Sequence, residues 1–172
     1  APCDYYQFGN KIEAEMNDYK RLKNIGIKIP EMLDVDIEQE RILKEYIDGD
    51  TIFELVKQDK MQETYFTQIK EMCELLYPAQ TNIDYFPTNF VVQNREMFYI
   101  DFECNNYMEE WNFENWGIKY WSKTEEFLKY FTLVFYIFVG ITAALIAISG
   151  IVYLVNNFSV FKEEKKEEKK EE

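Results

Sequence analysis

A long uncharged segment near the C-terminus constrains this 172-residue chain more than any other feature. No Asp, Glu, Lys or Arg occurs from Tyr130 to Phe161, and Phe131–Val155 reads FTLVFYIFVGITAALIAISGIVYLV. About 20 consecutive apolar residues are enough for a helix to cross the hydrocarbon core of a bilayer. A buried helix of a soluble protein is the alternative, but such helices are rarely so long and so evenly apolar. The sequence therefore predicts one transmembrane helix over residues 130–157.

The segment after it, residues 158–172, consists largely of alternating lysine and glutamate pairs. Like charges four residues apart, such as Lys165 and Lys169, oppose a helix, so we expect a solvated, disordered tail. The lysines of this tail outnumber those on the other flank of the apolar segment, which are Lys119, Lys123 and Lys129. The positive-inside rule alone would therefore place the tail in the cytosol.

The composition of the chain excludes several classes of function. There is no histidine, which removes Ser-His-Asp triads, HExxH zinc sites and imidazole acid–base catalysis. A formal net charge of −13 argues against direct binding of nucleic acid, because phosphate affinity comes mainly from clustered cations. Cys3, Cys73 and Cys104 are odd in number and widely spaced, which fits a reducing compartment better than a disulfide framework. Any catalysis must use carboxylates, hydroxyls, lysines, or a bound metal or cofactor.

Hydrophobic periodicity before position 130 predicts an α+β domain. Lys11–Ile25 has apolar residues at helical spacing, and Gly26 follows as the C-terminal cap. The apolar stripe of this helix includes Glu15, and a carboxylate on a buried face needs a cation or a solvated cleft. The alternative is a glutamate at the edge of the stripe that reaches water.

Shorter elements follow this helix. Thr51–Glu54 has the pattern of a capping box that opens a short helix, and a second helical stripe covers Phe66–Tyr77 before Pro78. Strands are predicted at Met32–Asp36, Arg41–Ile47, Phe90–Gln93 and Met97–Ile100. We expect the core to take up the aromatic residues that precede the apolar segment, which are Trp111, Phe113, Trp116, Tyr120 and Trp121.

Three polar residues bracket the last predicted hairpin. Asp84 lies in the loop that leads into it, Asn89 precedes its first strand, and Asp101 follows its second. Because a hairpin brings its two ends together, Asn89 and Asp101 should face each other across one cleft. Carboxylate and amide oxygens suit Mg²⁺, which takes few protein ligands and keeps phosphate oxygens and water for the rest. Asp84 could accept the proton of a hydroxyl that attacks a phosphoryl group. The alternative is that all three residues only stabilise loops and turns.

This arrangement resembles the catalytic motifs of the eukaryotic-like protein kinases. Asp84, Pro87 and Asn89 match D-x-x-P-x-N of the catalytic loop, and Asp101-Phe102 matches the start of D-F-G. The segments RILKEYIDG and NIGIKIPEML are most similar to small atypical kinases. These include the kinase subunit of the KEOPS tRNA-modification complex, the RIO kinases and, more distantly, the aminoglycoside phosphotransferases.

The resemblance covers about residues 11–125 and implies a kinase-like domain over 1–129. A partial N-lobe would occupy 1–47 and the C-lobe 48–129, followed by the single transmembrane helix.

Particular residues take roles from the same resemblance. Asp84 would be the catalytic base, and Asn89 and Asp101 would be the magnesium ligands. Glu15 would be the helix glutamate that normally pairs with a strand lysine. Backbone groups of the hinge would hold the adenine of ATP, at Glu45, Tyr46 and Ile47.

The chain also departs from the kinase pattern. No Gly-rich loop and no strand lysine precede Glu15, so we expect that the chain lacks the first strands of the family's N-lobe. In the catalytic loop, Asn82 stands in place of a histidine, Ile83 in place of an arginine and Phe86 in place of a lysine. Glu103 replaces the glycine of D-F-G.

These observations predict an ATP- and Mg²⁺-dependent phosphotransferase of the small atypical serine/threonine kinase type. Its partners would be ATP and a protein or small-molecule hydroxyl acceptor. The departures leave a membrane-tethered pseudokinase as one alternative. A small-molecule kinase of the aminoglycoside or choline type is another.

Phe131–Val155 would anchor the protein in a membrane, with the kinase-like domain on the cytoplasmic side because ATP is there. This orientation opposes the lysine count of the tail. A protein that lies wholly in the cytoplasm is the alternative.

Overall fold

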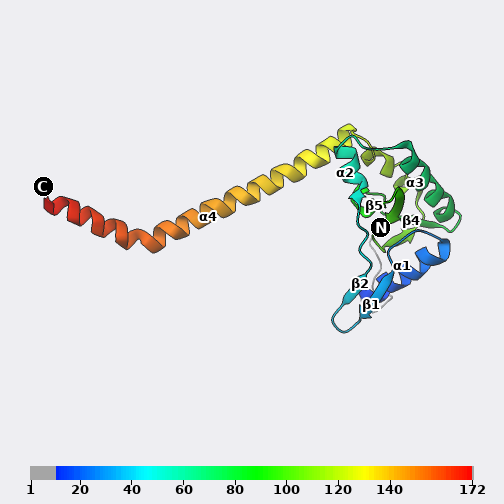
Figure 1. Cartoon of the computed structure of the whole chain (residues 1–172), viewed down its shortest axis with the longest axis horizontal. Helices are drawn as coiled ribbons and strands as arrows, with labels where there is room; N and C mark the ends of the chain where they lie inside the picture. The colour runs from blue at the N-terminus through cyan, green and yellow to red at the C-terminus, as the bar shows by residue number, and fades with distance from the viewer. Residues whose placement is uncertain (1–10, 172) are drawn as a thin grey trace. The chain divides into compact units, whose positions relative to one another are not determined.

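Small antiparallel sheets and short helices make up residues 11–124, and one long, largely apolar helix begins at Glu125 (Figure 1). The computed structural model describes the backbone of residues 11–171 and the side chains of residues 11–157, so Cys3 and the start of the expected N-lobe lie outside the described residues. The mixed α+β class predicted from sequence is confirmed. The chain divides into two units, 1–127 and 128–172.

The helices are α1 (Lys11–Ile25), α2 (Ile52–Lys57), α3 (Glu63–Leu76) and α4 (Glu125–Glu171), with 3-10 turns η2 (Pro87–Asn89), η3 (Glu109–Trp111) and η4 (Gly117–Tyr120). The strands are β1 (Met32–Asp36), β2 (Arg41–Lys44), β3 (Asp50–Thr51), β4 (Thr81–Ile83), β5 (Phe90–Gln93), β6 (Glu96–Tyr99) and β7 (Cys104–Asn106). They form three antiparallel sheets, of order β1-β2, β3-β5-β6 and β4-β7.

Local sequence signals account for most of these boundaries. Gly26 ends α1 with φ of +96°, a conformation that favours glycine, and its amide donates to the carbonyl of Leu22. Thr51 caps α2 in a complete capping box: its hydroxyl accepts from the Glu54 amide, and the Glu54 carboxylate accepts from the Thr51 amide. The β5–β6 hairpin turns at Asn94 and Arg95, both with positive φ.

The core lies between α3, the β5–β6 hairpin and the segment before α4. Trp121 is fully buried at its centre, donates its indole N–H to the carbonyl of Tyr85 at 2.8 Å, and contacts the rings of Phe90 and Phe113. The prediction that aromatic residues of this segment fill the core is therefore confirmed for Phe113 and Trp121. It is wrong for Trp111, whose side chain is 48% exposed because η3 lies at the surface.

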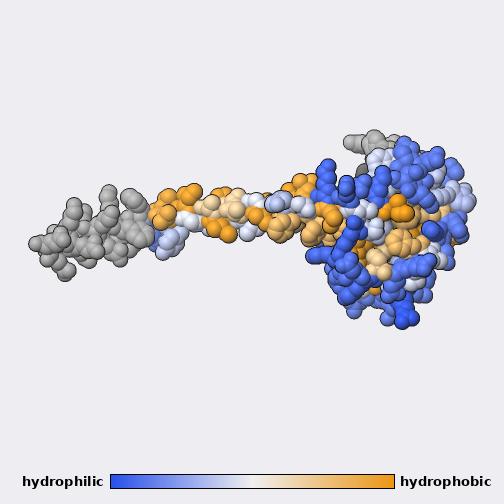
Figure 2. Space-filling view, turned by 90° about the horizontal axis from the view of Figure 1, so that it is seen from above, coloured by the Kyte–Doolittle hydropathy of each residue, from blue (hydrophilic) through white to orange (hydrophobic). Residues whose placement is uncertain are grey.

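The helix α4 carries the apolar segment. The stretch Glu125–Asn157 is the one helix among the described residues that is long and apolar enough to cross a membrane, and its most apolar part has no buried residue. Figure 2 shows hydrophobic side chains along α4 and a largely hydrophilic surface on the domain. The backbone of α4 remains helical to Glu171. This differs from the predicted disordered tail, and the high helix propensity of Lys and Glu is sufficient reason.

Candidate functional site

The loop after β4 holds Asp84 in a defined turn. A carboxylate oxygen of Asp84 accepts a hydrogen bond from the Phe86 amide at 3.0 Å, an arrangement typical of an Asx turn. Pro87 then opens η2 and is buried, and the Asn89 amide donates to the Phe86 carbonyl at 3.0 Å. The Asn89 side-chain amide reaches back to the Asp84 carbonyl at 3.4 Å. Asp84 and Asn89 are thus two ends of one compact loop.

The β5–β6 hairpin brings Asp101 to the same place. The two strands pair from Gln93–Glu96 at the turn to Phe90–Tyr99 at the open end. Beyond that pair, the Ile100 amide donates to the Asn89 carbonyl at 2.9 Å, so Asp101 follows directly beside Asn89. The structure therefore brings together Asp84, Asn89 and Asp101, as the hairpin argument predicted.

Tyr99 joins the two halves of this site, a role that sequence analysis did not identify. Its hydroxyl donates to the Glu103 carbonyl at 2.8 Å and accepts from the Asp84 amide at 3.4 Å. The ring is fully buried, and burial together with the nearby Asp101 carboxylate raises the pKa of Tyr99 well above its usual value. Tyr99 therefore stays protonated and keeps its donor. In the sequence it was indistinguishable from any apolar strand residue.

The environment of Asp84 raises the pKa of its carboxyl above the ordinary value. Desolvation by the surrounding protein raises the pKa of this carboxyl, hydrogen bonds from Phe86 and Asn89 lower it, and the carboxylates of Asp101 and Glu103 raise it further. The balance is a pKa above the ordinary value, although the side chain remains accessible to solvent. A shift in this direction is typical of a carboxylate that takes up a proton during a reaction.

The helix α1 contributes Glu15 and Asp18 to the edge of this site. Both line a small cavity with Lys11 and Glu103. Asp18 accepts a hydrogen bond from the Cys104 amide at 3.3 Å, and burial raises the pKa of its carboxyl. Glu15 is half-buried and lies beside the segment that follows Asp101. Two positions were predicted for Glu15: a cleft, or the edge of the apolar stripe where it reaches water. The structure agrees better with the cleft, because Glu15 lines the small cavity.

A lysine that sequence analysis missed also reaches the segment around Asp101. Lys44, the last residue of β2, donates its ammonium to the Ile100 carbonyl at 2.9 Å. The same Nζ lies 4.4 Å from the centroid of the Phe102 ring, a cation–π contact. Its position at the end of a strand gave no signal, because Lys44 and Ile100 are 56 residues apart in the sequence and meet only in the folded chain. Lys44 places a positive charge one residue from Asp101.

The expected hinge, Glu45–Ile47, follows β2 as extended chain. The strand ends at Lys44 rather than at Ile47 because its partner β1 begins at Met32, opposite Lys44. The Glu45 amide donates to the Glu31 carbonyl at 2.8 Å, whereas Tyr46 and Ile47 enter no backbone hydrogen bond with another residue in the described part of the chain.

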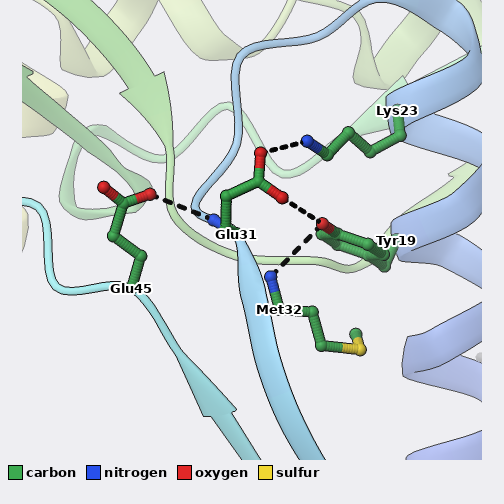
Figure 3. A network of polar contacts seen from close by, with 5 residues as sticks. All are labelled: Tyr19, Lys23, Glu31, Met32 and Glu45. Atoms are coloured by element: carbon green, nitrogen blue, oxygen red, sulfur yellow. Dashed lines mark hydrogen bonds and ion pairs between the residues drawn. The ribbon is translucent and has the colours of Figure 1, made fainter.

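A polar network fixes this hinge to α1 (Figure 3). The Glu31 carboxylate accepts from the Tyr19 hydroxyl at 3.1 Å and pairs with Lys23, and the Tyr19 hydroxyl accepts from the Met32 amide at 3.2 Å. Glu45 closes the network by accepting from the Glu31 amide at 3.2 Å. The pairing lowers the pKa of Glu31 and raises that of Lys23. These contacts hold the hinge backbone in one position.

The capacity of the site for a metal is limited. Among residues 11–157, no group of three or more His, Cys, Asp or Glu side chains is placed to hold an ion. Mg²⁺ does not need such a group when phosphate oxygens and water complete its octahedron. Asn89 and Asp101 are thus the two described residues whose side-chain oxygens could contribute to such a site.

Neither a protein-family model nor a curated protein matches the chain.

Proposed function

We propose that this chain is an ATP- and Mg²⁺-dependent phosphotransferase with a kinase-like domain. The observation that supports this most is the convergence of Asp84, Asn89 and Asp101 at the open end of one hairpin. Their order and spacing are those of the kinase catalytic loop and D-F-G segment, which the sequence resembles.

Each residue has a part in the proposed reaction. Backbone groups at Glu45–Ile47 bind the adenine, and Asn89 and Asp101 supply oxygens to the magnesium ion. That ion, when bound, would offset the charge of the phosphates. Asp84 orients the acceptor hydroxyl and accepts its proton, for which a raised pKa is favourable. Lys44 and Glu15 flank the D-F segment, and Lys44 provides the positive charge nearest Asp101.

The proposal is tested with Asp101→Asn in the full chain. We expect the variant to fold as the parent does, since Asn retains an oxygen that can accept the hydrogen bond from the Glu103 amide, but to lose Mg²⁺-dependent release of ADP from ATP. Asp34→Asn is the matched control, because Asp34 is an exposed carboxylate on β1. Equal rates of ADP release by the parent, Asp101→Asn and Asp34→Asn would contradict the proposal.

One observation favours a second candidate, a membrane-tethered pseudokinase that binds a partner without catalysis. The carboxylates of Asp101 and Glu103 lie close enough to Asp84 to raise its pKa. Three negative charges so close together repel the phosphates of a nucleotide unless a cation offsets them. This candidate predicts no ATP turnover at any magnesium concentration, which the same assay measures.

We also propose a location: the domain faces the cytoplasm and α4 anchors it to a membrane. The apolar surface of α4 supports the anchor, and the requirement for ATP supports the side.

A further inference from the structure

A cavity of about 290 Å³ opens directly beside Asp84. One wall comes from β4 and β7, and the other from Met108 and the tryptophans Trp111 and Trp116. Small-molecule sites begin at about this volume, so the cavity suits a compact molecule better than a folded peptide segment. Its described lining includes Asp84 and residues of β4 and β7, and none of Glu45–Ile47.

The charge of the cavity is negative. Asp84 and Glu103 line it, and no lysine or arginine is among the described residues that line it. The two tryptophans form a corner, with ring centroids 5.9 Å apart and planes inclined by 56°. Trp111 is 48% exposed although the ring is large and apolar. Aromatic faces next to carboxylates attract an organic cation, because the ring quadrupole and the carboxylates act in the same direction.

An unsatisfied buried acceptor gives independent evidence for a ligand. Asn82 is 4% exposed and lines the cavity. Its Nδ2 donates to the Met108 carbonyl at 2.8 Å, which fixes the orientation of the amide. Its Oδ1 is buried and has no hydrogen-bond partner among the described residues. A buried acceptor without a donor costs free energy, so a ligand with an N–H or O–H group would be stabilised there.

We propose that this cavity binds the phosphoryl acceptor, and that the acceptor is a small organic cation that carries a hydroxyl group. The inference rests on the proposed function and specifies its substrate class. The cation lies against Trp111 and Trp116, and the hydroxyl lies at Asp84. The hydroxyl proton passes to the Asp84 carboxylate while its oxygen forms a bond to the γ-phosphorus. The bond between that phosphorus and the β–γ bridging oxygen breaks, so the products are a phosphate monoester and ADP.

The test compares two probes of the same shape by ligand-observed NMR titration of the full chain in detergent. One probe is 2-(trimethylammonio)ethanol, and the other is its neutral carbon isostere, 3,3-dimethylbutan-1-ol. We expect saturable binding of the cation, and binding of the neutral probe weaker by about fivefold or more. Equal affinities, or no saturable binding of the cation, would overturn the inference.

Single substitutions test whether the cationic probe binds in this cavity. Trp111→Ala should weaken binding of the cationic probe by about fivefold or more without unfolding the domain, because the side chain is half exposed. Leu33→Ala is the control, since Leu33 is an exposed apolar residue of β1 outside the cavity, and it should bind as the parent does. Loss of affinity in both variants, or in neither, would contradict the placement.

A separate assay with Mg²⁺ and ATP distinguishes failure of the inference from failure of the proposed function. Phosphorylation of the cationic alcohol supports both. Saturable binding of the cation without any ATP turnover removes the proposed function and with it the role of the cation as acceptor. Turnover on a serine peptide, with no binding of the cation, overturns the inference alone.

Discussion

At the scale of single residues, Tyr99 is the contact on which the site depends. Its hydroxyl holds the Glu103 carbonyl and the Asp84 amide together, and both belong to segments that carry proposed catalytic groups. We predict that Tyr99→Phe lowers the free energy of unfolding by about 1–2 kcal/mol, because two backbone groups lose their partner. Urea unfolding followed by tryptophan fluorescence measures this.

The matched control for that variant is Tyr85→Phe. Tyr85 is equally buried, but its hydroxyl lies 3.9 Å from the Cys73 sulfur, a long contact that joins no segments of the site. We expect a smaller loss of stability there. If the two variants were equally destabilised, the effect would come from removing any buried hydroxyl and not from the link at the site.

Asp84 should make stability depend on pH. Because its pKa is raised in the folded state, the folded chain binds the proton more tightly than the unfolded chain, and stability falls as the pH rises through that range. We predict that Asp84→Asn, which keeps an oxygen to accept from Phe86, unfolds at slightly higher urea than the parent at pH 7, by about 0.5 kcal/mol at most.

The difference should shrink toward pH 4, because the raised pKa of the folded parent lets its carboxyl take up a proton as the pH falls. Unfolding curves at several pH values test this. A gain that persists unchanged at pH 4 would show that the charge of Asp84 is not its cause.

At the scale of elements, Gly49 determines how closely β3 approaches β5. A Cβ atom at this position would lie 2.0 Å from the carbonyl oxygen of Val92, a backbone atom that cannot move aside without breaking the sheet. We predict that Gly49→Ala destabilises the domain by about 1–3 kcal/mol. Gly140→Ala is the control, because nothing lies within 4 Å of the added atom. Urea unfolding measures the stability of both variants. If Gly49→Ala were as stable as Gly140→Ala, the close approach of β3 to β5 would be contradicted.

Elements with a local cause were predictable from sequence. Lys11–Ile25 and Met32–Asp36 have the predicted bounds, because helical periodicity with a glycine cap and strand alternation with a turn are local signals. The β4–β7 pair was not predicted, since Thr81–Ile83 and Cys104–Asn106 are short and meet only through tertiary structure. The same reason applies to the site. The proximity of Asp84, Asn89 and Asp101 was predictable because a hairpin joins them in the sequence. The contacts of Lys44 and Tyr99, and the cavity lined by Trp111, depend on long-range contacts and were not.

At the scale of the whole molecule, the apolar helix α4 is long enough to cross a membrane. Side chains such as Leu145 and Ile146 are well over half exposed, and large exposed apolar surfaces are typical of membrane or protein contacts. We predict that Leu145→Arg, near the middle of the span, opposes membrane insertion by about 2.5–3.5 kcal/mol. Alkaline extraction of membranes should then release the chain.

The control for that variant is Asn157→Arg. Asn157 lies at the end of the apolar helix, where an arginine side chain can reach the interface. This variant should stay in the membrane fraction. Release of both variants would indicate that any added charge detaches the chain, and release of neither would contradict a transmembrane span.

Two physical arguments predict opposite orientations of the span. The lysines after Phe161 favour the tail on the cytoplasmic side, whereas ATP chemistry at Asp84 and Asp101 requires the domain there. The tail also carries glutamates, which oppose translocation only weakly, so we predict that the nucleotide requirement decides. In sealed vesicles with the cytoplasmic face outward, a protease should digest the domain and spare a tag at the C-terminus. A digested tag and a protected domain would place the site away from ATP and exclude the proposed reaction.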